Sequence, residues 1–270
     1  MNKKNIKTIG LFSGGGGLDL GFSAAGFDLI YSSDIDPYSC QTLINNQAKK
    51  KFLNNHLVEC VDIRNLKGHE IENKTGVKAD FVIGGPPCQS FSVIGKRKGL
   101  NDPRGNLVYE YTRLIEELDP EGFLFENVAG LKTIHGGELF SELLNTLSIH
   151  GKYKVSVHEY EVADFGIPQF RKRIFFIGAK NNISVPMMSP THMNPKLPVN
   201  GHKPFKTVGE ILCDLPEPII DWKETPQING HVGRNHSLEI KKRYSQLTFG
   251  ERDHRTRINK LHPERPSYTI

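Results

Sequence analysis

A cysteine on a rigid loop is the first residue of this chain whose surroundings suggest chemistry. Cys88 follows two prolines, and the apolar run 81–83 before them is typical of a short buried strand. A thiol at the carboxyl end of a strand lies where open α/β sheets bind their ligands. Because the loop has no apolar periodicity, the sequence favours a nucleophile. The alternative is a small buried hydrophobic residue, the usual state of a free cysteine.

A carboxyl group and two guanidinium groups are expected at the same edge of the sheet. Glu126 follows the strand-like segment 122–125, so its side chain should lie near the Cys88 loop in any doubly wound order. Arg171 and Arg173 alternate along the chain before another apolar run and therefore share one face. These groups would converge on one site. An ordinary polar rim of the sheet is the alternative for the arginines.

Four consecutive glycines, Gly14 to Gly17, lie between an expected strand and an expected helix. A glycine-rich turn at such a place lets an adenosine-containing cofactor approach the main chain closely. The dinucleotide fingerprint requires Gly or Ala three residues after its second Gly, where this chain has Asp19 or Leu20. The loop therefore suits a cofactor without a pyrophosphate.

Two carboxylates follow the next expected strands. Asp34 ends the second strand, where it could bind ribose hydroxyls, and Asp62 ends the third, where it could accept an adenine amino group. Each carboxylate alone is more commonly a helix N-cap. Together with the glycine turn, the pair indicates an adenosine site.

Alternating strand and helix patterns position these residues. They predict an α/β fold with a doubly wound, mostly parallel sheet covered on both faces. Residues 107–118 have the clearest amphipathic helix pattern. Strands are expected at 7–12, 28–33, 57–61, 81–83, 122–125, 153–162 and 173–178, and helices at 18–27, 37–47, 107–118 and 139–147. Beyond Lys180 the chain is rich in proline and has little periodicity, which predicts two domains, 1–180 and an irregular 181–270.

Charge and cysteine usage narrow the class of protein. The formal net charge is +5, and residues 234–270 hold nine Lys or Arg against four Asp or Glu, so the rest of the chain is neutral. This basic end suggests a polyanionic partner, with a solvated surface as the alternative.

The four cysteines form no CxxC pair and no Cys/His cluster, which argues against structural zinc and favours a reducing compartment. No apolar run approaches the ~20 residues of a membrane span, and no secretory signal is visible.

Four motifs, taken together and in this order, resemble the signature motifs of DNA cytosine-5 methyltransferases. They are Phe12–Gly17, Pro87-Cys88-Gln89, Glu126-Asn127-Val128 and Gln169–Arg173, and the resemblance covers residues 7–180. It implies a Rossmann-like catalytic domain that uses S-adenosylmethionine, releases S-adenosylhomocysteine and needs no metal. Cys88 would be the nucleophile and Glu126 the group at the pyrimidine N3, while Arg171 and Arg173 would steady the base and the loop.

The resemblance also implies cofactor contacts and partners. The substrate would be duplex DNA with a flipped cytosine, in a restriction–modification system of the bacterial cytoplasm. Residues 181–270 would be part of a target-recognition region. The positions that match the family's cofactor contacts are Phe12, Ser13, Gly14, Gly16, Gly17, Leu18, Asp34, Ile35, Asp62, Ile63, Gly85 and Leu107.

The end of the chain departs from the family pattern. Residues 262–270 resemble the segment that closes the target-recognition region, and the two motifs expected after it are absent. We therefore expect either a shortened chain or a second polypeptide that supplies them. An inactive remnant, a subunit of a split enzyme and an RNA cytosine-5 methyltransferase remain alternatives. A nicotinamide-dependent oxidoreductase is disfavoured by Asp19 and Leu20.

Overall fold

The structure is a computed structural model in which residues 5–48, 56–87, 107–133, 137–196, 201–220, 226–228 and 230–269 are described. The chain forms two compact units. The first unit comprises Met1–Glu159 and Arg173–Met187, and the second comprises Tyr160–Lys172 and Met188–Ile270. This division differs from the expected boundary at residue 180, because residues 160–172, which connect β6 to β8, group with the later part of the chain.

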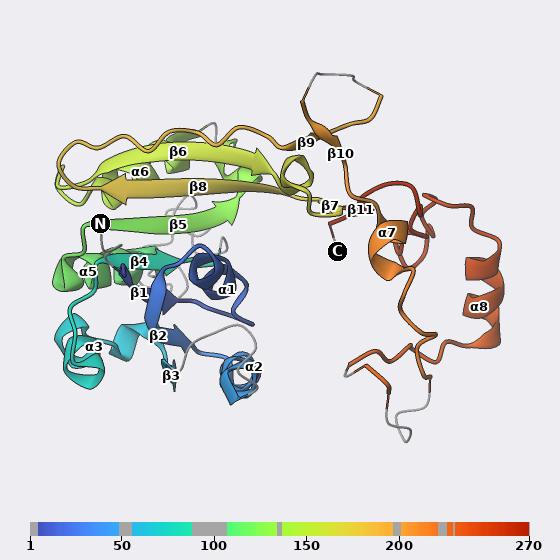
Figure 1. Cartoon of the computed structure of the whole chain (residues 1–270), viewed down its shortest axis with the longest axis horizontal. Helices are drawn as coiled ribbons and strands as arrows, with labels where there is room; N and C mark the ends of the chain where they lie inside the picture. The colour runs from blue at the N-terminus through green and yellow to red at the C-terminus, as the bar shows by residue number, and fades with distance from the viewer. Residues whose placement is uncertain are drawn as a thin grey trace. The chain divides into compact units, whose positions relative to one another are not determined.

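A seven-stranded sheet forms the centre of the first unit, in the order β3-β2-β1-β4-β5-β8-β6 (Figure 1). Neighbouring strands from β1 to β5 pair in parallel, and β8 is antiparallel to β5. This arrangement confirms the predicted doubly wound, mostly parallel α/β fold. The strands are β1 (Lys7–Leu11), β2 (Asp28–Asp34), β3 (Leu57–Cys60), β4 (Phe81–Gly84), β5 (Gly122–Val128), β6 (Lys154–Glu161) and β8 (Lys172–Ala179).

The strand order places a ligand crevice at one point of the sheet. Because β1 lies between β2 and β4, the direction of the strand order reverses there. Doubly wound sheets bind their ligands outside the carboxyl ends of the strands at such a reversal. The glycine turn follows β1, and Gly85 follows β4, so both predicted motifs lie at this place.

Helices cover both faces of the sheet. The larger core cluster joins α3, α5 and α6 to one face, while α1 packs Leu18 and Phe22 against a smaller cluster on the other. α5 has the predicted bounds, and its apolar stripe is buried except for Leu107, which is partly buried. In the described part of this unit, the helices and 3-10 turns are α1 (Gly17–Ala24), α2 (Pro37–Ala48), η1 (Ile63–Asn65), α3 (Gly68–Thr75), α5 (Leu107–Leu118), η2 (Ala129–Lys132) and α6 (Glu138–Ser148). The sequence pattern does not predict α3, because Ile71 is its one apolar residue and one residue leaves no period.

The second unit contains short elements joined by irregular chain, as the proline-rich composition predicts. Two pairs of two-residue strands are parallel, β7 (Gln169–Phe170) with β11 (Ser267–Tyr268) and β9 (His192–Met193) with β10 (Lys203–Pro204). The remaining elements are η4 (Val162–Phe165), α7 (Val208–Leu212) and α8 (Leu238–Ser245). None of the helices in the described ranges of either unit has the length and apolar character needed to cross a lipid bilayer.

Candidate active site

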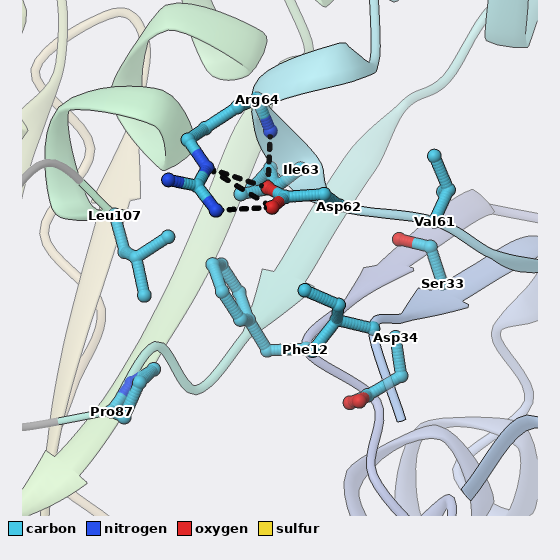
Figure 2. A pocket seen from close by; sticks show the side chains of 10 residues that line it. Phe12, Ser33, Asp34, Val61, Asp62, Ile63, Arg64, Pro87 and Leu107 are labelled. Carbon is cyan, nitrogen blue, oxygen red and sulfur yellow. Dashed lines mark hydrogen bonds and ion pairs between the residues drawn. The ribbon is translucent and has the colours of Figure 1, made fainter. Parts of the chain in front are cut away.

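A cavity of about 300 Å³ opens at the carboxyl ends of β1, β2 and β3. We call it the first cavity, and its volume lies at the lower end of the range for small-molecule sites. Its walls are Phe12, Ser33, Asp34, Ile35, Val61, Asp62, Ile63, Arg64, Pro87 and Leu107. Six of the twelve predicted cofactor positions are therefore brought together in one place. Figure 2 shows the Phe12 ring in the middle of these side chains, between the Asp62–Arg64 pair, Leu107 and Asp34.

The turn after β1 has an unusual backbone. Phe12 has a φ of +55°, a left-handed conformation that is uncommon for an aromatic residue, and Gly14 and Gly16 have φ values of +53° and +86°. These values let the chain reverse sharply between β1 and α1, which begins at Gly17. The predicted residues Ser13, Gly14 and Gly16 form this turn, and Phe12 is held over the first cavity.

The carboxylate of Asp34 is fixed by main-chain donors. Its Oδ2 accepts a hydrogen bond from the Gly14 amide at 2.7 Å, and its Oδ1 accepts one from the Asp36 amide at 2.9 Å. The Ser13 amide also donates to the Ser33 carbonyl, at 3.0 Å. The end of β2 therefore holds the glycine turn in place, and Asp34 is at once a tether of the turn and a wall of the first cavity.

Asp62 has the N-cap role that was the alternative at the sequence level. It caps η1 by accepting from the Arg64 amide at 3.0 Å. The Arg64 side chain also binds this carboxylate, with Nε 2.9 Å from Oδ1 and Nη2 in contact with Oδ2. These hydrogen bonds from Arg64 hold the pKa of Asp62 below its usual value. Arg64 was not identified from the sequence, although a cation two residues after a capping Asp is a detectable signal.

A second arginine, Arg113, joins the η1 turn to α5. Arg113 of α5 donates through Nη2 to the Ile63 carbonyl at 3.1 Å and to the Leu66 carbonyl at 2.9 Å. Its guanidinium is itself held by Glu110 and Glu117 on the same helix, at 2.7 and 2.6 Å. α5 therefore sets the position of Ile63 in the first cavity, which the sequence pattern alone does not reveal.

The predicted carboxyl group Glu126 lies beside a second cavity. This cavity of about 320 Å³ is lined by Phe12, Gly17, Leu18, Gly85, Glu126 and Phe175. Glu126 Oε1 accepts from Arg173 Nε at 2.7 Å, and the two side chains are 27% and 14% exposed. Gly85 is close to the same group, since a Cβ built there would lie 3.1 Å from Glu126 Oε2. Phe12 lines both cavities, so the predicted cofactor positions and Glu126 meet at this ring.

The antiparallel register of β5 and β8 explains why Arg173 reaches Glu126. Glu126 is paired with Phe175, and Val128 is paired with Arg173. Arg173 is thus two residues away along the ladder and on the same face, within reach of the carboxylate. Arg171 lies between β7 and β8 and belongs to the second unit. Its amide donates to the Glu161 carboxylate within that unit.

Asn127 holds the main chain that leads to the predicted nucleophile. Asn127 is 4% exposed, and its Nδ2 donates to the Pro86 carbonyl at 3.1 Å. Its Oδ1 accepts from the Val128 amide at 2.8 Å. Cys88 and Gln89 lie outside the described residues, so the role of Cys88 stays a prediction. Pro87, the residue before Cys88, is a wall of the first cavity.

The sequence of this chain is similar to known proteins along most of its length. The family model of the C-5 cytosine-specific DNA methylase matches residues 6–267. The type II methyltransferase M.AquIA of Picosynechococcus is 37% identical over 223 residues, covering 78% of this chain and 89% of the relative. M1.HphI of Haemophilus parahaemolyticus is 36% identical over 248 residues, covering 91% of this chain and 62% of the relative.

One solved structure has a similar fold along nearly the whole of this chain. It is a chain assigned as a DNA modification methyltransferase encoded in a prophage of E. coli, with a TM-score of 0.73 and 27% identity. The match covers 98% of this chain and 82% of that one. This chain belongs to the C-5 cytosine-specific DNA methylase family.

Proposed function

We propose that this chain transfers a methyl group from S-adenosylmethionine to C5 of cytosine in duplex DNA, as the modification enzyme of a type II restriction–modification system. Family membership and the type II methyltransferases among its relatives support the reaction. The observation that carries the proposal is the cavity at the ends of β1, β2 and β3. Six cofactor positions expected from the motifs line it together.

The residues of the first cavity suit the proposed cofactor. Apolar groups of Phe12, Ile35, Ile63 and Leu107 fit the faces of an adenine ring, and Asp34 offers carboxylate oxygens for ribose hydroxyls. The third glycine position of the dinucleotide fingerprint holds Asp19 or Leu20 in this chain, which agrees with a cofactor that has no pyrophosphate. S-adenosylmethionine supplies an electrophilic methyl group to the site.

The proposed chemistry assigns one task to each group. The Cys88 thiolate adds to C6 of a flipped cytosine, which places electron density on C5 while Glu126 holds N3. A base then removes the C5 proton after methylation, and Cys88 leaves by elimination, which regenerates the thiolate. Arg173 orients Glu126 through the 2.7 Å ion pair. We propose that Arg171 steadies the loop and that Asn127 sets the backbone before Cys88.

A labelling experiment tests the proposal. The protein is incubated with tritiated S-adenosylmethionine and either mixed-sequence duplex DNA or tRNA, and the nucleosides are separated after digestion. We expect labelled 5-methylcytosine from the DNA. Label in the tRNA alone would instead support the RNA methyltransferase alternative, and cofactor binding without transfer would support an inactive remnant or a subunit.

The same assay addresses a second polypeptide. This chain spans 89% of M.AquIA, 70% of M.FnuDI of Fusobacterium nucleatum and 62% of M1.HphI, so parts of the longer relatives have no counterpart in it. We propose to repeat the assay with the polypeptide encoded next to this chain. Transfer that needs both polypeptides supports a split enzyme, and equal transfer by the single chain contradicts it.

A further inference from the structure

A buried polar network lies under the glycine turn, outside the two cavities. Its centre is Asp19 in the first turn of α1, a carboxylate residue that is 1% exposed. Its Oδ1 accepts from Ser13 Oγ at 3.2 Å and from Ser32 Oγ at 2.7 Å. Ser13 belongs to the turn and Ser32 to β2, so one oxygen atom joins the turn to the strand beneath it.

The network continues in one direction to the chain after α2. Gln47 Nε2 donates to the His56 carbonyl at 3.0 Å, and it lies 2.8 Å from His56 Nδ1. An amide nitrogen only donates, so Nδ1 of His56 is assigned as the acceptor and its ring hydrogen is assigned to Nε2. Nε2 then donates to Ser32 Oγ at 2.8 Å. The single hydroxyl hydrogen of Ser32 is therefore directed at Asp19.

The backbone leaves room for this carboxylate. A Cβ built on Gly10 of β1 would lie 2.1 Å from Asp19 Oδ1 and 2.9 Å from Ser13 Oγ. Asp19 Oδ2 is buried and has no hydrogen-bond partner in the described part of the chain. Burial raises the pKa of Asp19, although the bonds from Ser32 and Ser13 oppose this effect. A buried carboxylate oxygen without a hydrogen-bond partner lowers the stability of the folded chain. Proteins keep such groups mainly at functional sites.

We propose that Asp19 is a positioning residue for S-adenosylmethionine, because it holds the Ser13 side of the glycine turn in the conformation that receives the cofactor. This inference rests on the proposed function. Asp34 holds the Gly14 amide from the side of the first cavity. Asp19 holds the Ser13 hydroxyl from below. The turn is thus fixed at two successive residues. It is already ordered before the cofactor binds, so binding does not carry the entropic cost of ordering it.

The experiment measures S-adenosylmethionine affinity by calorimetry for the whole chain and four variants. Ser13→Ala removes the bond to the turn, and Asp19→Ala removes the centre of the network. Each should weaken binding about three- to tenfold, the effect of one or two buried hydrogen bonds. Asp19→Asn should bind nearly as the original chain does, because its amide oxygen accepts both bonds. Ser141→Ala, an exposed serine on α6, is the matched control and should not change the affinity.

Kinetics separates positioning from stability. At saturating cofactor, Asp19→Ala should keep kcat, while the KM for S-adenosylmethionine rises by the same factor as the dissociation constant. Unchanged affinity in Ser13→Ala overturns the proposal, even if Asp19→Ala fails to fold. Asp19→Asn binding as weakly as Asp19→Ala also overturns it, because the hydrogen bonds accepted by this side chain would then not explain the affinity. If the unaltered chain binds no S-adenosylmethionine, the proposed function fails and this inference fails with it.

Discussion

Asp34 shows how one carboxylate can serve the turn and the ligand. Its two oxygens accept the Gly14 and Asp36 amides in the structure, and its side chain also forms a wall of the first cavity. A carboxylate oxygen has more than one lone pair, so accepting an amide leaves capacity for a hydroxyl. The expected contact with ribose and the role as a tether of the glycine turn are therefore compatible.

We predict that Asp34→Ala weakens S-adenosylmethionine binding by roughly ten- to a hundredfold. Charge-assisted hydrogen bonds are worth ~1.5–3 kcal/mol, and the turn also loses a tether. Calorimetry measures the change. Asp28→Ala is the matched control, because Asp28 lies at the opposite end of the same strand and pairs with Lys7 at 2.6 Å. Equal affinity in Asp34→Ala and the unaltered chain would mean that Asp34 does not contribute to cofactor binding.

We predict that Cys88→Ser abolishes methyl transfer and leaves cofactor binding nearly unchanged, because the thiol acts on the base. Duplex DNA with 5-fluorocytosine at the target should form a covalent adduct with Cys88, since fluorine blocks the final elimination. Intact-mass spectrometry detects the adduct. Cys213→Ser, which removes an exposed thiol in the second unit, should keep full activity. Active methylation with no adduct on the fluorinated DNA would refute the covalent mechanism.

The antiparallel strand β8 is the element that completes the site. It enters the sheet between β5 and β6 and runs opposite to β5, as Figure 1 shows, which brings Arg173 to Glu126. The far end of β8 is held by Asp119, the residue after α5. Asp119 Oδ1 lies 2.6 Å from Lys180 Nζ and 2.7 Å from Lys152 Nζ. These contacts fasten the end of the strand, and with it the register that positions Arg173.

We predict that Asp119→Asn lowers the free energy of unfolding by about 1 kcal/mol at pH 7 and has little effect near pH 2. Hydrogen bonds from Lys152 and Lys180 lower the pKa of Asp119 to about 2. The folded-state pKa is below the unfolded one, so the stabilisation is complete above about pH 4 and is lost as the pH falls through 2. The carboxylate is 41% exposed, so solvent screening keeps the effect small.

Urea titrations of Asp119→Asn and the unaltered chain at both pH values test this. Asn tolerates the left-handed φ of +46° at this position, which removes backbone strain from the comparison. A matched control is Glu116→Gln, an exposed carboxylate on α5. A difference in stability that does not change with pH would show that the ion pairs are not its cause.

At the scale of the whole molecule, the positive charge is concentrated in the second unit. Nine Lys or Arg lie between residues 234 and 270. Within the described part of that unit, Arg243 pairs with Asp253 at 2.6 Å and Arg255 pairs with Glu239 at 3.0 Å. Asp253 is fully buried, so the first pair stabilises the fold of this region. The other seven cations are the candidates for contact with phosphate.

We predict salt-sensitive binding of duplex DNA. If about six cations contact phosphates, the affinity should fall ~10³-fold between 50 and 200 mM salt through counterion release. Fluorescence anisotropy at several KCl concentrations measures the slope. Lys241→Ala and Lys242→Ala should each reduce it by about one, whereas Lys74→Ala, in the first unit and paired with Glu59, should not. A slope near zero would show that this basic region is only a solvated surface.

The local sequence pattern predicted the main elements that carry the site. The apolar stripe 107–118 predicted α5. The strand ends indicated Asp34 and Asp62, and the family resemblance added Phe12 and Ile63, all of which line the first cavity. The reason is physical: side-chain period and glycine conformation depend on neighbours a few residues away, and parallel strands in a doubly wound sheet bring their carboxyl ends together.

Contacts between distant segments could be known only from the tertiary structure. The Arg173–Glu126 pair depends on the register of an antiparallel strand, and the Asn127–Pro86 bond joins the ends of two strands. The Asp19 network joins β2 to a turn, and in the sequence Asp19 only argues against a dinucleotide site. Register and side-chain direction are set by packing across the sheet, which no local period encodes. The sequence by itself determined that the glycine turn, Asp34 and Asp62 follow successive strands, and the tertiary structure decided which groups at the crevice hold one another.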